Sequence, residues 1–170
     1  MSFLQRLTRK QPRDQLRPLW HAVVGTSRER EWYADCGVAD TVEGRFDMIA
    51  LVLALTMLRM EDSPALAPKT GPLTELFVAD MDRQLRDGGV GDLMVGKKIG
   101  RMMEALGGRI GVLRENLTGS DAALAVILKR NVTLADEDKK PFALAVRARA
   151  LHDRLTGLTD AQVLAGEIGA

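Results

Sequence analysis

The longest apolar run in the sequence predicts a buried helix. No charged residue occurs between Asp47 and Arg59, and every position from Met48 to Leu58 is apolar except Thr56. The run is too short to cross a bilayer, which takes about 20 apolar residues, and too long for a typical strand of about 4–8 residues. A helix that is apolar all round is normally buried. We therefore expect a central helix over about residues 43–61, with other helices packed around it.

Amphipathic stripes predict further helices after the central one. Apolar residues recur at spacings of three and four in two segments, the spacing that places them on one face of a helix. The stripes consist of Leu73, Leu76, Phe77, Met81 and Leu85 in the first segment and Val95, Ile99, Met102, Met103 and Leu106 in the second. No segment shows the alternating pattern of a half-buried strand. The sequence thus predicts an all-α fold, a single compact domain of seven to eight helices.

Capping residues mark where these helices should begin and end. Short polar side chains accept hydrogen bonds from the first free N–H groups of a helix, and glycine is common just after its last turn. The expected N-terminal caps are Asp40 or Thr41, Thr70, Asp92, Ser120, Asp138 and Thr159. We expect the glycine pair at 107–108 to break or end the helix that starts at Asp92.

Composition and charge exclude several classes of protein. The chain has 170 residues, of which 46% are hydrophobic and 28% charged, an ordinary globular balance that argues against disorder. The net charge of +1 gives no overall attraction to nucleic acid. Residues 1–30 nevertheless hold seven Arg and Lys residues against two acidic ones, a local charge of +5. We interpret residues 1–12 as a basic tail and residues 13–170 as the helical domain.

The single cysteine and the character of the N-terminus predict a cytoplasmic location. Cys36 cannot form an internal disulfide, which fits a reducing compartment. The basic start of the chain is broken by polar residues and contains no apolar core of a secretory signal.

None of the sequence patterns that suggest phosphate or metal binding is complete. The segment from Gly91 matches a phosphate-binding loop until Lys98, where a Ser or Thr should hold magnesium, and no strand precedes it. Asp80 and Asp82 would point about 200° apart on a helix, so they cannot share a metal ion. The two histidines have no ligand-spaced partner. The sequence therefore predicts no catalytic, cofactor-binding or metal-binding residue and no enzyme.

A basic ridge is the clearest surface feature of the second striped segment. Lys97, Lys98 and Arg101 share one side of the expected helix, with Arg109 and Arg114 further along. Such a ridge can contact a phosphate backbone or an acidic partner, but on charge alone an ordinary solvated helix face is the preferred interpretation.

Two stretches carry a resemblance to a known family. The first runs from Trp32 to Leu55 and the second from Leu76 to Arg109, and together they resemble the two signatures of the ubiquinol–cytochrome c chaperone family. The matching positions are Tyr33, Ala34, Gly37, Val38, Asp40, Thr41, Gly44, Arg45, Phe46 and Asp47 in the first, and Asp80, Met81, Asp82, Leu85, Arg86, Gly89, Val90, Gly91, Asp92, Val95, Lys97, Gly108 and Arg109 in the second. The likeness is weaker over residues 120–170. Val52 stands where the family often has a histidine in the central helix.

The resemblance implies a bacterial, non-enzymatic assembly factor that receives newly made cytochrome b for the respiratory bc1 complex (complex III). Its implied partners are cytochrome b or its nascent chain, the ribosome, and the inner membrane through peripheral contact at its cytoplasmic face; no DNA and no cofactor are expected. Polar motif positions that the core does not need, together with the basic ridge, are the candidate partner-binding residues. They are Arg45, Asp80, Asp82, Arg86, Asp92, Lys97, Lys98 and Arg101.

Two other functions remain open from the sequence. The basic N-terminal segment and the ridge would suit a ribosome- or RNA-associated factor, whose binding would fall steeply with salt. A helical domain that binds a small apolar ligand would instead need a large, well-formed apolar cavity.

Overall fold

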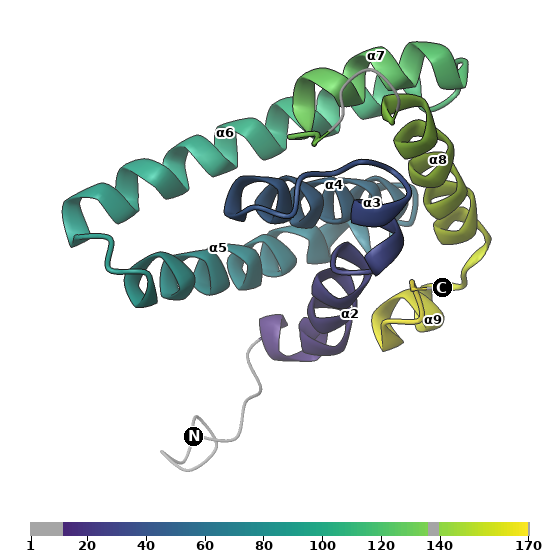
Figure 1. Ribbon diagram of the computed structural model, residues 1–170. Helices are drawn as coiled ribbons and strands as arrows, with labels where there is room; N and C mark the ends of the chain where they lie inside the picture. Colours follow the sequence, from purple (N-terminus) through teal and green to yellow (C-terminus); the bar gives the residue numbers. More distant parts are fainter. Residues whose placement is uncertain (1–11, 136–139, 170) are drawn as a thin grey trace, which may run out of the picture.

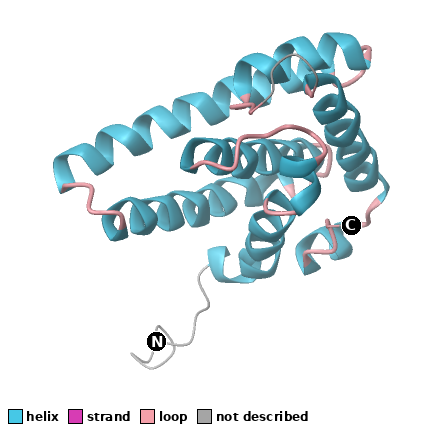
Figure 2. Cartoon of the chain, viewed as in Figure 1, coloured by secondary structure: helices cyan, strands magenta, loops and turns pink. Residues whose placement is uncertain are grey.

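The computed structural model describes residues 12–135 and 140–169, and within them the chain forms eight α-helices and two short 3-10 helices with no strand (Figures 1 and 2). The elements are η1 (Pro12–Leu16), α2 (Arg17–Ser27), α3 (Arg30–Ala34), α4 (Val42–Glu61), η2 (Ala67–Lys69), α5 (Thr70–Asp87), α6 (Asp92–Asn116), α7 (Asp121–Asn131), α8 (Pro141–Gly157) and α9 (Asp160–Ala165). The predicted all-α fold with seven to eight helices is confirmed.

Helix α4 is the centre of the molecule, as its composition predicts. Helices α2, α5, α6 and α8 pack around it (Figure 1). Every residue from Met48 to Leu58 is buried. Thr56, the one polar residue of that run, satisfies its hydroxyl within the helix by donating to the carbonyl of Val52 at 2.8 Å. Thr41 caps the helix by accepting a hydrogen bond from the Gly44 N–H at 3.1 Å.

Helices α5 and α6 form a long hairpin beside α4, and the turn between them lies at one end of the molecule (Figure 1). The predicted stripe of α5 is buried from Leu73 to Leu85. In the second stripe Val95 and Leu106 are buried, and the other three residues pack partly buried against the core. The turn needs Gly89, whose φ of +81° lies in the left-handed region that glycine adopts without strain.

Helix α6 runs without interruption through the glycine pair, so the predicted break at residues 107–108 is wrong. Leu106, Arg109 and Leu113 are buried on one side of this part of the helix. A Cβ atom at either glycine would meet no atom within 4 Å, so the pair faces open space. The two glycines weaken the helix by up to about 1 kcal/mol each, and we infer that packing of the buried side outweighs this cost.

The capping predictions are partly confirmed. Ser120 and Thr159 cap α7 and α9 with their hydroxyls, and Thr159 forms a complete capping box with Gln162. Thr70 and Asp92 are not caps, because each is the first residue of its helix. The hydroxyl of Thr70 donates backwards to the carbonyl of Ala67, where η2 runs directly into α5.

Asp138, the remaining predicted cap, lies outside the described residues. Helix α8 begins at Pro141, and the residue before it, Lys140, provides no side-chain cap.

Candidate partner-binding surface

The structure divides the eight candidate residues among three places. Four lie on α5 or at the start of α6, three follow along α6, and one lies near the start of α4. In that order the three sets are Asp80, Asp82, Arg86 and Asp92, then Lys97, Lys98 and Arg101, and finally Arg45.

Arg86 ties the hairpin turn together. Its Nε donates to Asp82 Oδ2 at 2.8 Å on the same helix, and its Nη1 donates to Asp92 on the next one. These hydrogen bonds raise the pKa of Arg86, and the one to Asp82 contributes most. The Asp92 carboxylate therefore pairs across the turn and does not cap α6, which explains why the cap prediction fails.

Asp80 does not join this cluster. Its carboxylate pairs with Arg83, one turn along α5, and borders a groove with Arg17 and Trp20. Asp82 forms its ion pair with Arg86. The two acidic side chains therefore act separately, as their helical spacing predicts.

The basic ridge is confirmed only in part. Lys97, Lys98 and Arg101 are exposed, and none of them pairs with an acidic side chain in the part of the chain that the structure describes. Arg114 is also on the surface, where it pairs with Glu61 at 2.7 Å. Arg109 is not part of the ridge, because its side chain is turned inward and is only 6% exposed.

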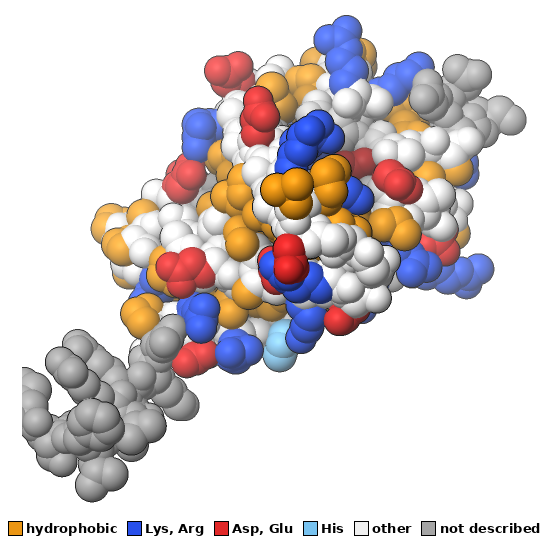
Figure 3. All heavy atoms as spheres, turned by 90° about the vertical axis from the view of Figure 1, so that its left-hand side faces the viewer, with side chains coloured by type: hydrophobic (Ala, Val, Ile, Leu, Met, Phe, Trp, Pro, Cys, Tyr) orange, Lys and Arg blue, Asp and Glu red, His pale blue; other side chains and the backbone are white. Residues whose placement is uncertain are grey.

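Two apolar side chains at the hairpin end were not among the predicted site residues. Leu93 is 91% exposed and Met94 is 44% exposed, immediately after the turn. Figure 3 shows the molecule from this end, where apolar side chains gather near the centre of the face among basic and acidic ones. We call the surface formed by Arg86, Asp92, Leu93, Met94 and the three ridge residues the hairpin surface. The sequence signal for it was an apolar pair before the stripe of α6 begins.

Arg45 lies apart from the hairpin surface, near the start of α4. Its Nε donates to Asp40 Oδ1 at 2.7 Å, and both side chains are exposed. The hydrogen bond from Arg45 holds the pKa of the Asp40 carboxyl below its usual value. Arg45 also borders an open cavity with Arg28, Arg30 and Tyr33.

A partly buried polar junction joins helices that are distant in sequence. Arg109 Nη2 donates to Asp47 Oδ1 at 3.0 Å and to the carbonyl of Asn131. The other oxygen of Asp47 accepts from the N–H and the hydroxyl of Thr133, at 3.0 and 2.8 Å. Asp47 and Arg109 both belong to the family signatures quoted above, so the signature match was the signal for this junction.

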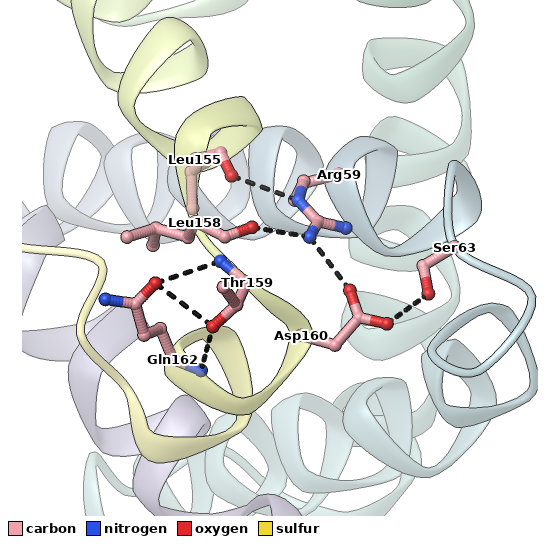
Figure 4. A network of polar contacts seen from close by, with 7 residues as sticks. All are labelled: Arg59, Ser63, Leu155, Leu158, Thr159, Asp160 and Gln162. Carbon is pink, nitrogen blue, oxygen red and sulfur yellow. Dashed lines mark hydrogen bonds and ion pairs between the residues drawn. The ribbon is translucent and has the colours of Figure 1, made fainter.

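A second junction connects the end of α4 to the C-terminal helices (Figure 4). Arg59 donates to the carbonyls of Leu155 and Leu158, at 3.0 and 2.7 Å, and to Asp160 Oδ1 at 2.8 Å. Ser63 donates to the other oxygen of Asp160 at 2.6 Å. Arg59 thus donates to two carbonyls at and just after the C-terminal end of α8, and the Leu155 carbonyl also accepts from the N–H of Leu158.

The chemistry of the described residues is limited. No group of three or more His, Cys, Asp or Glu side chains comes together at metal-binding distance within residues 12–135 and 140–169. In the same residues no helix is both long and apolar enough to span a bilayer. What the described surface offers is a set of charged and apolar side chains that can contact another molecule.

Comparison with known proteins identifies the class. The chain belongs to the ubiquinol–cytochrome c chaperone family, whose model matches residues 34–170. The chain is also similar to a protein of known structure, the Cbp3 homolog from Brucella abortus. The two share 28% sequence identity with a TM-score of 0.79, over 99% of this chain and 96% of that one. No curated protein matches the sequence.

Proposed function

We propose that this protein binds newly made cytochrome b and promotes its assembly into the bc1 complex, in the cytoplasm or at the cytoplasmic face of the inner membrane. Its family consists of ubiquinol–cytochrome c chaperones, which supports the assembly role. The structural observation that carries the proposal is the hairpin surface, where Leu93 and Met94 project into solvent beside charged side chains. A nascent membrane protein presents apolar segments that must be held without being trapped.

The composition of the hairpin surface suits this task. Two exposed apolar residues form a small contact, which favours reversible binding over a permanent interface. Methionine is flexible and adapts to apolar partners of different shape. The basic side chains of Lys97, Lys98 and Arg101 speed the encounter with an acidic partner and orient it. The hairpin surface therefore combines a weak apolar anchor with electrostatic guidance.

The first experiment is deletion of the gene in its own host. We would measure cytochrome b by reduced-minus-oxidised haem spectra of the membranes. Selective loss of cytochrome b, with other cytochromes unchanged and restoration by the wild-type gene, is the expected result. Normal cytochrome b under several growth conditions would reject the proposal.

A ribosome- or RNA-associated role is the second candidate. It is favoured by the three basic side chains of the ridge, which have no acidic partner among the described residues. Counterion release makes such binding fall steeply as salt rises. Cosedimentation of the protein with ribosomes at low and high salt, and its loss on Lys97→Glu, would distinguish this role from binding to cytochrome b alone.

Binding of a small apolar ligand receives less support. Two cavities of the described chain each have a volume of about 650 Å³. One is bordered by three arginines and an aspartate, and the other is a shallow groove that includes Arg13, Glu75 and Asp82. Neither is the enclosed apolar cavity that such a ligand needs.

A further inference from the structure

An open cavity with an unusual charge lies where α2, α3 and the segment before α4 meet. Its volume is about 650 Å³. The residues that border it are Arg28, Arg30, Tyr33, Ala34, Asp40 and Arg45. Three arginines against one aspartate give this lining a formal charge of +2. The hairpin surface shares no residue with this cavity.

The acidic residues next to these arginines are held on a different side. Glu29 and Glu31 alternate with Arg28 and Arg30 in the sequence, yet both carboxylates pair with Arg147 of α8, at 2.7 and 3.7 Å. The Arg147 guanidinium lies over the ring of Trp32, 4.7 Å from its centre, a cation–π contact that fixes its position. The contact with α8 therefore draws the neutralising carboxylates away from the cavity.

Two of the three cavity arginines have no carboxylate partner. Among the described residues, neither the Arg28 side chain nor the Arg30 side chain forms a hydrogen bond or an ion pair. Arg45 already binds one oxyanion, the Asp40 carboxylate, with 2.7 Å between Nε and Oδ1. One guanidinium group of the cavity thus already binds an anionic group, and the other two are available to bind a further anion.

Tyr33 lies close to the positive charges of both Arg28 and Arg45. Its hydroxyl donates to the carbonyl of Ser27 at 2.9 Å, which fixes the ring at the cavity wall. Burial raises the pKa of Tyr33, while the positive charges of Arg45 and Arg28 act on the same hydroxyl in the opposite direction. These two arginines come from different helical segments, so the fold brings them together.

A smaller cavity with a mixed polar and apolar lining adjoins the charged one. It has a volume of about 150 Å³, shares Arg28 and Arg45, and is otherwise bordered by Val42, Phe46, Ile49 and Gln84. Val42 is 65% exposed at its edge. The two cavities together place three arginines beside three apolar side chains.

We propose that the charged cavity binds a phosphoryl group through Arg28, Arg30 and Arg45. The planar guanidinium fork matches the oxygens of a phosphate, and such charge-assisted hydrogen bonds are stronger than neutral ones. A phosphate monoester carries about −1.5 to −2 charges at neutral pH, which balances the lining charge. The phosphoryl group belongs either to a soluble phosphate ester or to a phospholipid headgroup, whose apolar part would reach the adjoining cavity.

Isothermal titration of the full chain with inorganic phosphate and glycerol phosphate tests the site. The double variant Arg28→Ala/Arg30→Ala removes two exposed side chains, so circular dichroism should show an unchanged fold. We expect it to weaken phosphate binding about tenfold or more, because two of the three charge-assisted donors are lost. The matched control, Lys97→Ala/Lys98→Ala, removes the same charge from the hairpin surface and should change binding by less than about twofold.

Vesicle flotation separates the two sources of the phosphoryl group. Binding to phosphatidic acid vesicles but not to phosphatidylcholine vesicles, lost in the arginine variant alone, would assign a lipid headgroup. Phosphate binding without vesicle binding would assign a soluble ester. The proposal is overturned if neither phosphate nor vesicles bind, or if the lysine control weakens binding as much as the arginine variant. Binding of a glutamate-rich peptide without phosphate binding would also overturn it, in favour of an acidic protein segment.

Discussion

Arg109 of α6 and Asp47 of α4, 62 positions apart in the sequence, form an ion pair with 3.0 Å between Nη2 and Oδ1. Arg109 is almost completely buried, and this carboxylate provides its counter-charge. The pair also positions Thr133, because the second oxygen of Asp47 accepts two hydrogen bonds from that residue. One carboxylate thus connects α4, α6 and the segment after α7.

Replacement of Asp47 should strongly destabilise the protein. The variant Asp47→Ala leaves a buried guanidinium without its counter-charge and removes the oxygen that accepts both hydrogen bonds from Thr133, for an expected loss of about 3–5 kcal/mol in the free energy of unfolding. Urea unfolding followed by circular dichroism measures this loss. Glu61→Ala removes the carboxylate of the surface pair with Arg114 and should cost less than about 1 kcal/mol. Equal losses in the two variants would contradict the central role of the buried pair.

Two glycine-to-alanine substitutions should act in opposite directions. At Gly44 a Cβ atom would lie 1.9 Å from the backbone oxygen of Ala39, so α4 or the preceding segment must shift. We expect Gly44→Ala to cost about 1–3 kcal/mol. At Gly107 a Cβ atom meets nothing within 4 Å, and alanine should stabilise α6 by about 0.5–1 kcal/mol. Thermal unfolding of both variants provides the measurement; a lower melting temperature for Gly107→Ala would argue against a continuous α6.

Asp160 should make stability depend on pH in the acidic range. The hydrogen bond from Ser63, followed by that from Arg59, lowers the pKa of Asp160 from its usual value of 3.8. A carboxyl with a lower pKa in the folded state contributes stability above its unfolded pKa, and this contribution is lost as pH falls through the folded pKa. The wild type should therefore be more stable than Asp160→Asn at pH 7, and the difference should disappear as pH falls below 3.8.

Urea unfolding of both proteins at pH 7, 5 and 3 checks this prediction. Ser63→Ala provides the control for the cause, because it removes the hydrogen bond that lowers the pKa of Asp160 most. The difference in stability between wild type and Ser63→Ala should show part of the same pH dependence. A difference between wild type and Asp160→Asn that stays constant with pH would contradict the prediction.

Leu93→Glu should impair partner binding without affecting stability. Because Leu93 is almost fully exposed, its replacement should change the free energy of unfolding by no more than about 0.5 kcal/mol. Under the proposed function, capture of newly made cytochrome b, measured by crosslinking during synthesis in vitro, should fall. Val126→Glu introduces the same charge at an exposed apolar position of α7 and should leave capture unchanged. Equal effects of both variants would remove the hairpin surface from the proposal.

The sequence predicts helices well here because burial leaves a periodic trace along the chain. The unbroken apolar run of α4 and the stripe of α5 identify both helices correctly. The local rules fail where long-range contacts decide. Residues 107–108 look like a helix end, but the buried residues around them keep α6 continuous. Asp92 has the chemistry of a cap, but its carboxylate pairs with Arg86 across the turn.

The candidate site was harder to predict for the same reason. Charge and motif position select Arg86 and Asp92 but do not reveal that the two form a pair. Arg109 lies in a basic stretch of the sequence, and only the fold shows that it turns inward to meet Asp47. Leu93 appears as one more apolar residue near a stripe, since exposure is a property of the packed molecule.

The long separations at the Asp47 junction set an order of events during synthesis. The partners of Asp47 are encoded 62 and 86 positions later in the chain. At a translation rate of about 5–20 residues per second, the apolar central helix emerges on the order of ten seconds before its junction can be completed. During that interval the helix is itself an unprotected apolar segment on the ribosome, in the same physical situation as the membrane protein that we propose as its client.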